Sequence, residues 1–308
     1  MTNEPLVSVL MTSYNREQYI SEAIESVLAS TYTNFELIIV DDSSTDNTVE
    51  IAKSYESKES RVRVFVNEKN LAQFGNRNKA ASYSRGYFLK YFDSDDVMYP
   101  DCLEVMVSAM AKYPEAGVVS QTNDPWITEN SLPRFYTSRE CYINHFFNGN
   151  TILYSGPSGC MFKREVFEEF GGFDEKIGIL SDTLLMFKIA AAYPVVGVRN
   201  DLFYWRRHDG QVTIGQLNWF EMVKQRFEIN QIALNSGNLP LSKKEQKIIF
   251  RNVKNILVRR MIRNLVAKQN LKEFFKLISI SNLKFSDFIK ATIKNKRLNN
   301  PLNQNISS

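Results

Sequence analysis

Residues 7–48, VSVLMTSYNREQYISEAIESVLASTYTNFELIIVDDSSTDNT, decide the fold. The apolar run 6–11 predicts a strand, and apolar residues at three- and four-residue spacing over 19–28 predict a helix with one buried face. Residues 35–40 are nearly all apolar, as in a strand covered on both faces, and they run directly into two aspartates. This order of strand, helix and strand predicts a parallel sheet covered by helices.

The same alternation continues beyond that stretch. It predicts turn and N-cap residues at 43–47 before a helix that runs to about 57, and further helices over 76–84, 102–110 and 182–192. The predicted strands are 61–66, 87–92, 117–121 and 195–204. Residues 156–172 suggest only a turn, a short helix and a second turn, and the chain after residue 217 is helical. The predicted fold class is therefore α/β, a mostly parallel sheet flanked by helices, with one domain over 1–215 and a helical C-terminal extension over 216–308.

Composition excludes several classes of protein. With 308 residues, 44% hydrophobic and 23% charged, the chain fits a globular protein rather than a disordered, collagenous or disulfide-stapled one. No apolar run approaches the roughly 18 residues of a membrane-spanning helix, and the N-terminus lacks a signal-peptide pattern. The three cysteines, Cys102, Cys141 and Cys160, form no CxxC pair, which fits a reducing compartment. A cytoplasmic location is expected.

The charge is divided unevenly along the chain. Residues 241–300 hold 16 Lys or Arg and three acids, a local charge of +13, whereas residues 1–240 carry −9. Two apolar stripes run through this basic tail, one over 249–261 and one over 271–278. Such helices either lie on an anionic membrane surface or dock on the body of the protein, and both alternatives stay open. Nucleic-acid binding is not expected, because the tail has no reader motif or stacking platform.

Polar residues gather where three of the predicted strands end. Thr12-Ser13-Tyr14-Asn15, Asp41-Asp42 and Asp93-Ser94-Asp95-Asp96 each follow a strand. Ligands of parallel α/β sheets collect at the carboxyl ends of the strands, so these groups are expected to meet. Three carboxylates within four residues repel one another unless a cation neutralises them, and Mg²⁺ or Mn²⁺ prefers such oxygen ligands. The alternative is a solvated acidic cluster at a helix start.

The other strand ends suit a nucleoside. A carboxylate there can accept hydrogen bonds from a base or from ribose hydroxyls, with Asp42 as the first candidate and Asp41 as the second, unless the pair only begins a turn. Tyr14 is placed to stack on the base and Thr12 to offer its hydroxyl. The chain has neither GxGxxG after its first strand nor a Walker motif, which weighs against dinucleotide redox enzymes and common nucleoside triphosphatases.

At this point a family resemblance is clear. Residues 7–48, NLAQFGNRNKA at 70–80, YFDSDD at 91–96, GCMFKREVFEEFGGFDE at 159–175 and WRRH at 205–208 resemble the inverting family 2 glycosyltransferases of bacterial polysaccharide assembly, which have the GT-A fold. The resemblance covers about two thirds of the chain and leaves the basic tail outside it. It implies transfer of a sugar from a nucleotide-diphosphate donor to a hydroxyl, with inversion at the anomeric carbon and a divalent metal.

Matched position by position, the resemblance implies a role for each motif. The implied donor-binding residues are Thr12, Tyr14, Asn15, Asp41, Asp42, Arg77, Asp93 and Ser94. Asp93, Asp95 and His208 are the implied ligands of Mn²⁺ or Mg²⁺, although Arg77 could be only a salt-bridge residue and His208 only structural. Asp182 is the implied catalytic base, with an N-cap role as the alternative. Ser181, Ala72 and Ser43 depart from the family pattern.

The sequence therefore predicts a metal-dependent inverting glycosyltransferase. Its expected partners are a nucleotide-sugar donor, with UDP as the expected nucleotide, and a saccharide or lipid-linked acceptor. The acceptor is expected beneath an insertion at 123–160 and beside Pro157, Ser158 and Gly159, where small residues allow close approach. The expected location is cytoplasmic, with peripheral contact at the inner face of the membrane as an alternative. A sugar nucleotidyltransferase and a non-catalytic saccharide- or lipid-binding module are the competing functions.

Overall fold

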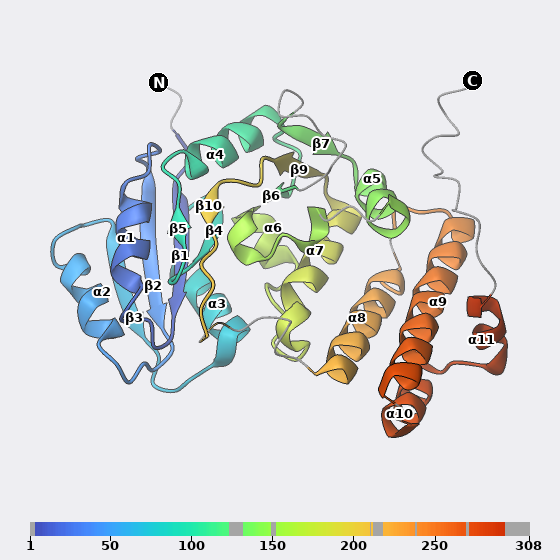
Figure 1. The fold of residues 1–308 in the computed structure, drawn as a ribbon. Helices are drawn as coiled ribbons and strands as arrows, with labels where there is room; N and C mark the ends of the chain where they lie inside the picture. The colour runs from blue at the N-terminus through green and yellow to red at the C-terminus, as the bar shows by residue number, and fades with distance from the viewer. Residues whose placement is uncertain are drawn as a thin grey trace.

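A computed structural model describes residues 4–122, 132–148, 152–209, 211, 218–237, 239–268 and 271–292. In these residues an eight-stranded sheet has the order β3-β2-β1-β4-β8-β6-β9-β7. Helices cover both of its faces and a helical unit extends from one side (Figure 1). The predicted α/β class is confirmed.

The N-terminal half of the sheet is parallel. It consists of β1 (Val7–Ser13), β2 (Phe35–Asp41), β3 (Val62–Val66) and β4 (Phe88–Asp93). Every residue of β2 is buried, which explains its continuous apolar sequence. In the register, Thr12 of β1 lies opposite Asp93 of β4, and Ser13 lies opposite Asp41 of β2. The polar groups at the strand ends are thereby brought to one edge.

The other half of the sheet differs from the sequence prediction. It contains β6 (Val118–Gln121), β7 (Arg134–Tyr136), β8 (Cys160–Lys163) and β9 (Val195–Val198). Strand β8 runs antiparallel between β4 and β6, where the sequence predicted only a turn before a short helix. Strand β7 of the predicted insertion pairs with β9 and forms an edge of the sheet. Strands β6 and β9 lie within the predicted strands 117–121 and 195–204, whereas β7 and β8 escaped prediction because they are short and lie in segments interpreted as an insertion and as a turn.

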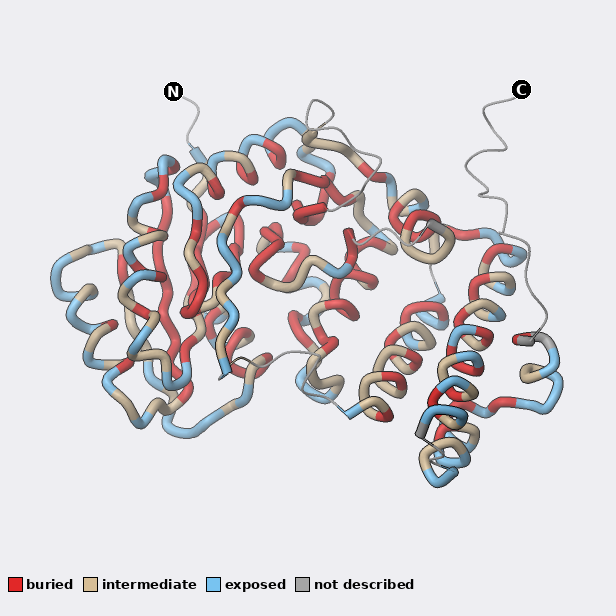
Figure 2. The backbone as a smooth tube through the Cα atoms, viewed as in Figure 1, coloured by how far each residue is buried: buried red, intermediate tan, exposed pale blue. Residues whose placement is uncertain are grey.

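Two apolar cores lie on the two faces of the sheet. One includes buried residues of α1 (Ile20–Leu28), α2 (Thr48–Glu56) and α4 (Cys102–Lys112). The other includes α3 (Ala72–Tyr83), α6 (Arg164–Glu169) and α7 (Ser181–Ala192). The inner strands of the sheet are almost entirely buried, whereas its edge strands β3 and β7 are partly exposed (Figure 2). A separate two-stranded antiparallel sheet pairs β5 (Val97–Met98) with β10 (Phe203–Tyr204) and brings the WRRH segment to the aspartates after β4.

The second core continues into the C-terminal helices. These are α8 (Trp219–Leu234), α9 (Lys243–Lys268), α10 (Leu271–Ser281) and α11 (Phe285–Thr292). The stripe at 249–261 is buried at Ile249, Val253, Leu257 and Met261, and two hydrogen bonds from Arg139 of α5 (Ser138–Ile143) to Glu245 fasten α9. For this stripe, docking on the body is therefore observed. None of the described helices has the length and apolarity needed to cross a bilayer.

Candidate functional site

The loop after β1 is built around a buried aspartate. Asp41 is fully buried and accepts hydrogen bonds from the Ser13 hydroxyl at 2.9 Å and from the Ser44 backbone N–H at 2.7 Å. Asn15 adopts a positive φ of 51°, and its N–H donates to the Ser44 hydroxyl. These bonds hold the loop in which Tyr14 is 46% exposed, so its ring is available as a stacking platform. Asp41 thus shapes the loop that presents Tyr14.

Asp42 joins the second strand to the loop before α3. Its Oδ1 accepts hydrogen bonds from Asn67 Nδ2 at 2.9 Å and from the Leu71 backbone N–H at 2.7 Å. Asn76 completes this arrangement by donating to the Val40 carbonyl. Both bonds to Asp42 use one carboxylate oxygen, which fixes its direction at the edge of the sheet. The geometry fits its predicted role as acceptor for a base or ribose.

Asp93 at the end of β4 has two partners. Arg77 Nη2 donates to one of its oxygens at 2.6 Å, and the Ser158 hydroxyl donates to the other at 3.0 Å. Ser94 behind it donates to the Thr12 carbonyl at 2.9 Å. The Asp93 side chain remains one third exposed, whereas Arg77 is buried. The predicted group of Thr12, Arg77, Asp93 and Ser94 is therefore brought together.

Asp95 is paired with an arginine and a histidine. Arg16 Nε donates to its Oδ2 at 2.9 Å, and His208 Nε2 lies 2.9 Å from the same oxygen. The histidine ring also packs against Tyr19, with centroids 4.6 Å apart. His208 therefore lies at the acidic site, as predicted. Arg16 was missed by the sequence analysis, and its position directly after the first strand-end motif is the only signal that could have identified it.

The residues present fit a shared cation better than a closed metal cage. Within the ranges described above, no three His, Cys, Asp or Glu side chains converge in a metal-binding arrangement. Asp93 and Asp95 nevertheless lie on one turn, with His208 beside Asp95. Mg²⁺ commonly binds through one or two carboxylates and completes its shell with phosphates and water. This donor set therefore suits a cation held jointly with a diphosphate.

Asp96 is buried below these two acids. Burial and then the charge of Asp93 raise the pKa of Asp96 to about 8, although the backbone N–H of Arg206 donates to it at 3.0 Å. Arg206 also donates from Nε to the Asp95 carbonyl at 2.9 Å. The WRRH segment is thus bonded to the acidic turn by backbone and side chain. At neutral pH Asp96 is mainly protonated, which reduces repulsion in the cluster.

Asp182 lies in the first turn of α7. Burial raises its pKa to about 6, against the opposing effects of the Thr183 backbone N–H, 2.6 Å away, and the charge of Arg77. The N-cap residue of this helix is Leu180, so the alternative that Asp182 is only an N-cap is wrong. A partly buried carboxylate with a pKa near neutrality can accept a proton, which is what a general base requires.

The predicted acceptor-side residues form a 3₁₀ turn, η4 (Pro157–Gly159), directly beside Asp93. Ser158 is buried; its hydroxyl contacts Asp93 and its carbonyl accepts a hydrogen bond from the buried Lys90 ammonium. A Cβ on Gly159 would lie 3.0 Å from Ser155 Cβ, a tight contact that favours glycine at this position. The rest of the predicted insertion, residues 123–131 and 149–151, lies outside the described residues.

Comparison with known proteins identifies relatives of this chain. The family model "Glycosyl transferase family 2" matches residues 8–171, more than half of the chain. The chain is 44% identical over 107 residues, 35% of its length, to the Escherichia coli UDP-Glc:alpha-D-GlcNAc-diphosphoundecaprenol beta-1,3-glucosyltransferase WfgD, of which the match spans only 42%. It is also 29% identical over 263 residues to an uncharacterized glycosyltransferase of Rickettsia typhi, covering 81% of this chain and 76% of that one.

Two solved structures share the fold. The structure of S. aureus TarS 1–349 in complex with UDP-GlcNAc has a TM-score of 0.66 at 19% identity, covering 92% of this chain and 81% of that one. The mannosyltransferase PcManGT from Pyrobaculum calidifontis, in complex with GDP-Man and Mn²⁺, has a TM-score of 0.61 at 18% identity, covering 96% and 88%. At this level of identity the likeness shows a common GT-A architecture.

Proposed function

Because this chain belongs to glycosyltransferase family 2, we propose that it is an inverting enzyme that transfers a sugar from a nucleoside-diphosphate donor to an acceptor hydroxyl. The observation that carries the proposal is the position of Arg77. Its guanidinium bonds Asp93 at the strand-end site, and its charge acts on Asp182. One residue thus links the proposed diphosphate site to the proposed base, which supports a single displacement between a leaving group at Asp93 and a hydroxyl at Asp182.

The chemistry of the site follows from these positions. Asp182 accepts the proton of the acceptor hydroxyl as that oxygen attacks the anomeric carbon from the face opposite the diphosphate. Arg77 and Arg16, which pair with Asp93 and Asp95, favour the negative charge that grows on the departing diphosphate. A bound Mn²⁺ or Mg²⁺, held by Asp93 and Asp95 with His208, would neutralise the same charge. Tyr14 and Asp42 hold the nucleoside.

The donor and the acceptor can be proposed by class. The names of WfgD and of the TarS complex both specify UDP-linked sugars, which supports UDP as the nucleotide. The name of WfgD also specifies an acceptor linked to a lipid through a diphosphate. Together they support a saccharide or lipid-linked acceptor, in the synthesis of a surface polysaccharide or glycoconjugate. The proposed catalytic domain is 1–215, followed by the helical region 216–308.

A test of this function measures nucleotide release. The purified protein is incubated with UDP-glucose, UDP-GlcNAc, GDP-mannose and a dTDP-sugar, with and without a saccharide acceptor, in Mn²⁺, Mg²⁺ or EDTA. Release from one donor class, abolished by EDTA and by Asp95→Ala, is expected. Asp182→Asn should still bind the donor but lose turnover, whereas the exposed Asp201→Asn serves as the charge-matched control. Donor binding without turnover under every condition would favour a non-catalytic module and refute the proposal.

The outer helices support a proposed membrane contact. Leu271 and Phe275 of α10 are 57% and 63% exposed, and Phe285 and Ile289 of α11 are 81% and 53% exposed. The basic tail surrounds these apolar residues, a combination that favours anionic lipid surfaces. Flotation with phosphatidylglycerol-containing and pure phosphatidylcholine vesicles tests the contact. Binding to the anionic vesicles should be lost in a Phe275→Ser, Phe285→Ser variant, and equal binding by variant and wild type would contradict it.

A further inference from the structure

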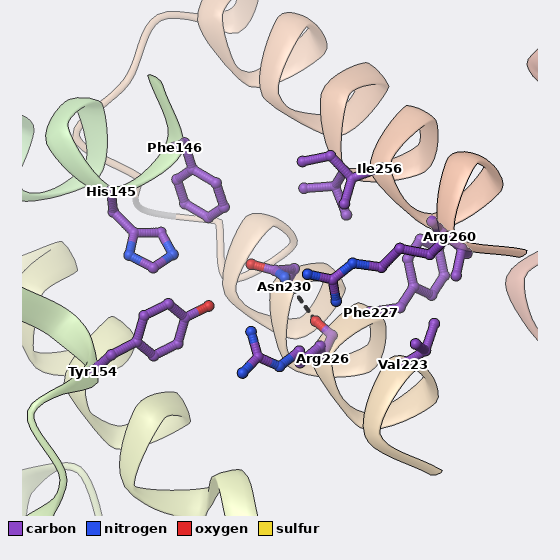
Figure 3. Close-up of a pocket in the computed structure, with 11 residues that line it drawn as sticks. His145, Phe146, Tyr154, Val223, Arg226, Phe227, Asn230, Ile256 and Arg260 are labelled. Carbon is purple, nitrogen blue, oxygen red and sulfur yellow. Dashed lines mark hydrogen bonds between the residues drawn. The ribbon is translucent and has the colours of Figure 1, made fainter. Parts of the chain in front are cut away.

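A cavity lies between the catalytic body and the C-terminal helices (Figure 3). Its volume is about 450 Å³, which is within the range of small-molecule sites. The walls come from η2 (Asn144–Asn148) and η3 (Ile152–Tyr154) on one side and from α8 and α9 on the other. Segments more than one hundred residues apart in sequence therefore form one cavity.

Two arginines face this cavity without a negative partner. Arg226 on α8 and Arg260 on α9 form no ion pair with any described Asp or Glu, and Arg226 Nε is buried without a hydrogen-bond partner. Burial and the charge of Arg226 lower the pKa of Arg260. Two guanidinium groups that repel each other in a partly buried cavity destabilise the folded protein unless an anion binds between them. Their charge and their free donors suit a phosphate.

Neighbouring polar groups complete a recognition site. The hydroxyl of Tyr154 points into the space beside Arg226, whose guanidinium lies 5.9 Å from the tyrosine ring centroid (Figure 3). Asn230 donates from its amide to the Arg226 carbonyl at 2.6 Å, and its own Oδ1 is buried without a partner. Burial lowers the pKa of His145 to about 4, so the imidazole is neutral at pH 7. The arginines therefore set the charge of the cavity.

The remaining walls are apolar. They consist of Phe146, Val223, Phe227, Val253, Leu257 and Ile256. Ile256 is 52% exposed, which places the apolar side at the entrance of the cavity. An anion that carries an apolar chain would satisfy both parts of this lining, because the chain could leave along α9.

The cavity is coupled to the proposed base through Tyr154. The ring of Tyr154 lies 6.5 Å from that of Phe187, which is on α7 together with Asp182. The charge of Asp182 raises the pKa of the Tyr154 hydroxyl, while those of Arg226 and Arg260 lower it, although burial has the largest effect. Helix α7, which carries Asp182, packs against both η3 and α8. A group bound at the arginines would therefore lie near the helix of the proposed base.

We propose that Arg226 and Arg260 bind the phosphate or diphosphate of a phosphate-bearing acceptor, and so hold that acceptor beside Asp182. This assignment rests on the proposed glycosyl transfer, because it names the acceptor class for the same base. The phosphate could belong to an isoprenoid lipid or to a soluble phosphorylated saccharide. The apolar entrance favours the lipid.

Calorimetric titration tests the assignment with three probes: farnesyl phosphate, inorganic phosphate and uncharged farnesol. Wild type should bind farnesyl phosphate more tightly than either other probe. Arg226→Gln and Arg260→Gln should each weaken that binding about tenfold or more, as expected for loss of a charged hydrogen bond. Arg251→Gln, on the exposed side of α9, is the matched control and should leave the affinity unchanged. Retained UDP binding shows that each variant is folded.

The outcomes separate this proposal from the proposed function. The acceptor site alone would be overturned if the enzyme turned over a donor but bound neither farnesyl phosphate nor inorganic phosphate. Equal affinity for farnesyl phosphate in the arginine variants and in Arg251→Gln would overturn it as well. Equal affinity for inorganic and farnesyl phosphate, lost in both variants, would assign the site to a soluble phosphorylated acceptor. Failure of wild type to bind any nucleotide would remove the glycosyl-transfer premise instead.

Discussion

Replacing Asp182 with asparagine should stabilise the protein at neutral pH while abolishing turnover. Burial raises the pKa of this carboxyl from 3.8 to about 6, so the folded state disfavours the ionised form that a base requires. Asparagine is nearly isosteric and uncharged. Its side-chain oxygen can still accept the hydrogen bond from the Thr183 backbone N–H. The substitution thus removes the cost of the charge and preserves the local contact.

The magnitude follows from the two pKa values. The difference between the unfolded-state pKa of 3.8 and the folded-state pKa of about 6 corresponds to about 3 kcal/mol of unfolding free energy, at about 1.4 kcal/mol per pKa unit. Because the pKa of Asp182 is raised, the folded state binds more protons than the unfolded state between the two values, and wild-type stability falls as pH rises through that window. The advantage of Asp182→Asn should therefore be absent below pH 3.8, grow toward pH 6 and stay constant above it.

Urea unfolding at pH 4 and pH 7.5 measures this difference, with Asp201→Asn as an exposed control. We expect similar midpoints for wild type and Asp182→Asn at pH 4, and a higher midpoint for the variant at pH 7.5. The wild-type rate should also rise with pH around 6, as the base ionises. A stability difference that does not change with pH, or a variant that keeps its turnover, would refute the reasoning.

Two further predictions concern the scaffold. Glu245→Gln removes the ion pair with Arg139 and should reduce the free energy of unfolding by only about 1–2 kcal/mol at pH 7, because Arg139 is partly exposed and solvent screens the pair. The hydrogen bonds from Arg139 lower the pKa of Glu245 to about 2, so the difference between variant and wild type should shrink as pH falls from 4.5 toward 2 in urea titrations. Gly86→Ala should destabilise by about 1–3 kcal/mol, because the new Cβ would lie 2.4 Å from the Ser8 backbone nitrogen. Gly171→Ala, with nothing within 4 Å but a φ of +75°, is its control in thermal unfolding and should lose less.

The parallel half of the sheet could be predicted because burial on both faces leaves a continuous apolar signature. Residues 35–40 show this pattern, and the observed β2 extends it by one residue. Strand β8 could not be predicted in the same way. It contains the buried Lys163, whose ammonium donates to the Pro114 carbonyl, and this long-range contact has no signal in the local sequence. Its position between β4 and β6 depends on pairing that only the folded chain defines.

The candidate site also contains residues that the sequence predicts and residues that it does not. Asp93 and Asp95 were predictable because acids at a strand end have a specific meaning in parallel sheets. Arg16 and Arg206 were not, because an arginine near a motif is common and its partner is decided by the geometry of the loop. The cavity at Arg226 was even less predictable from sequence, because it depends on how α8 and α9 pack against η3. Its lining residues look like ordinary helix positions in sequence.

In the proposed mechanism, Arg77 would allow a bound donor to change the pKa of Asp182. Only Nη2 has a partner in the described structure, while Nε and Nη1 are buried without one. A diphosphate that accepted hydrogen bonds from these two atoms would also offset the positive charge that lowers the pKa of Asp182. The base should then titrate at higher pH with donor bound. We expect the acidic limb of kcat, which reports the complex, to lie at higher pH than that of kcat/KM, which reports the free enzyme. Arg77→Gln should bring the two limbs together, and limbs that already coincide in wild type would show that Arg77 does not couple the donor to the base.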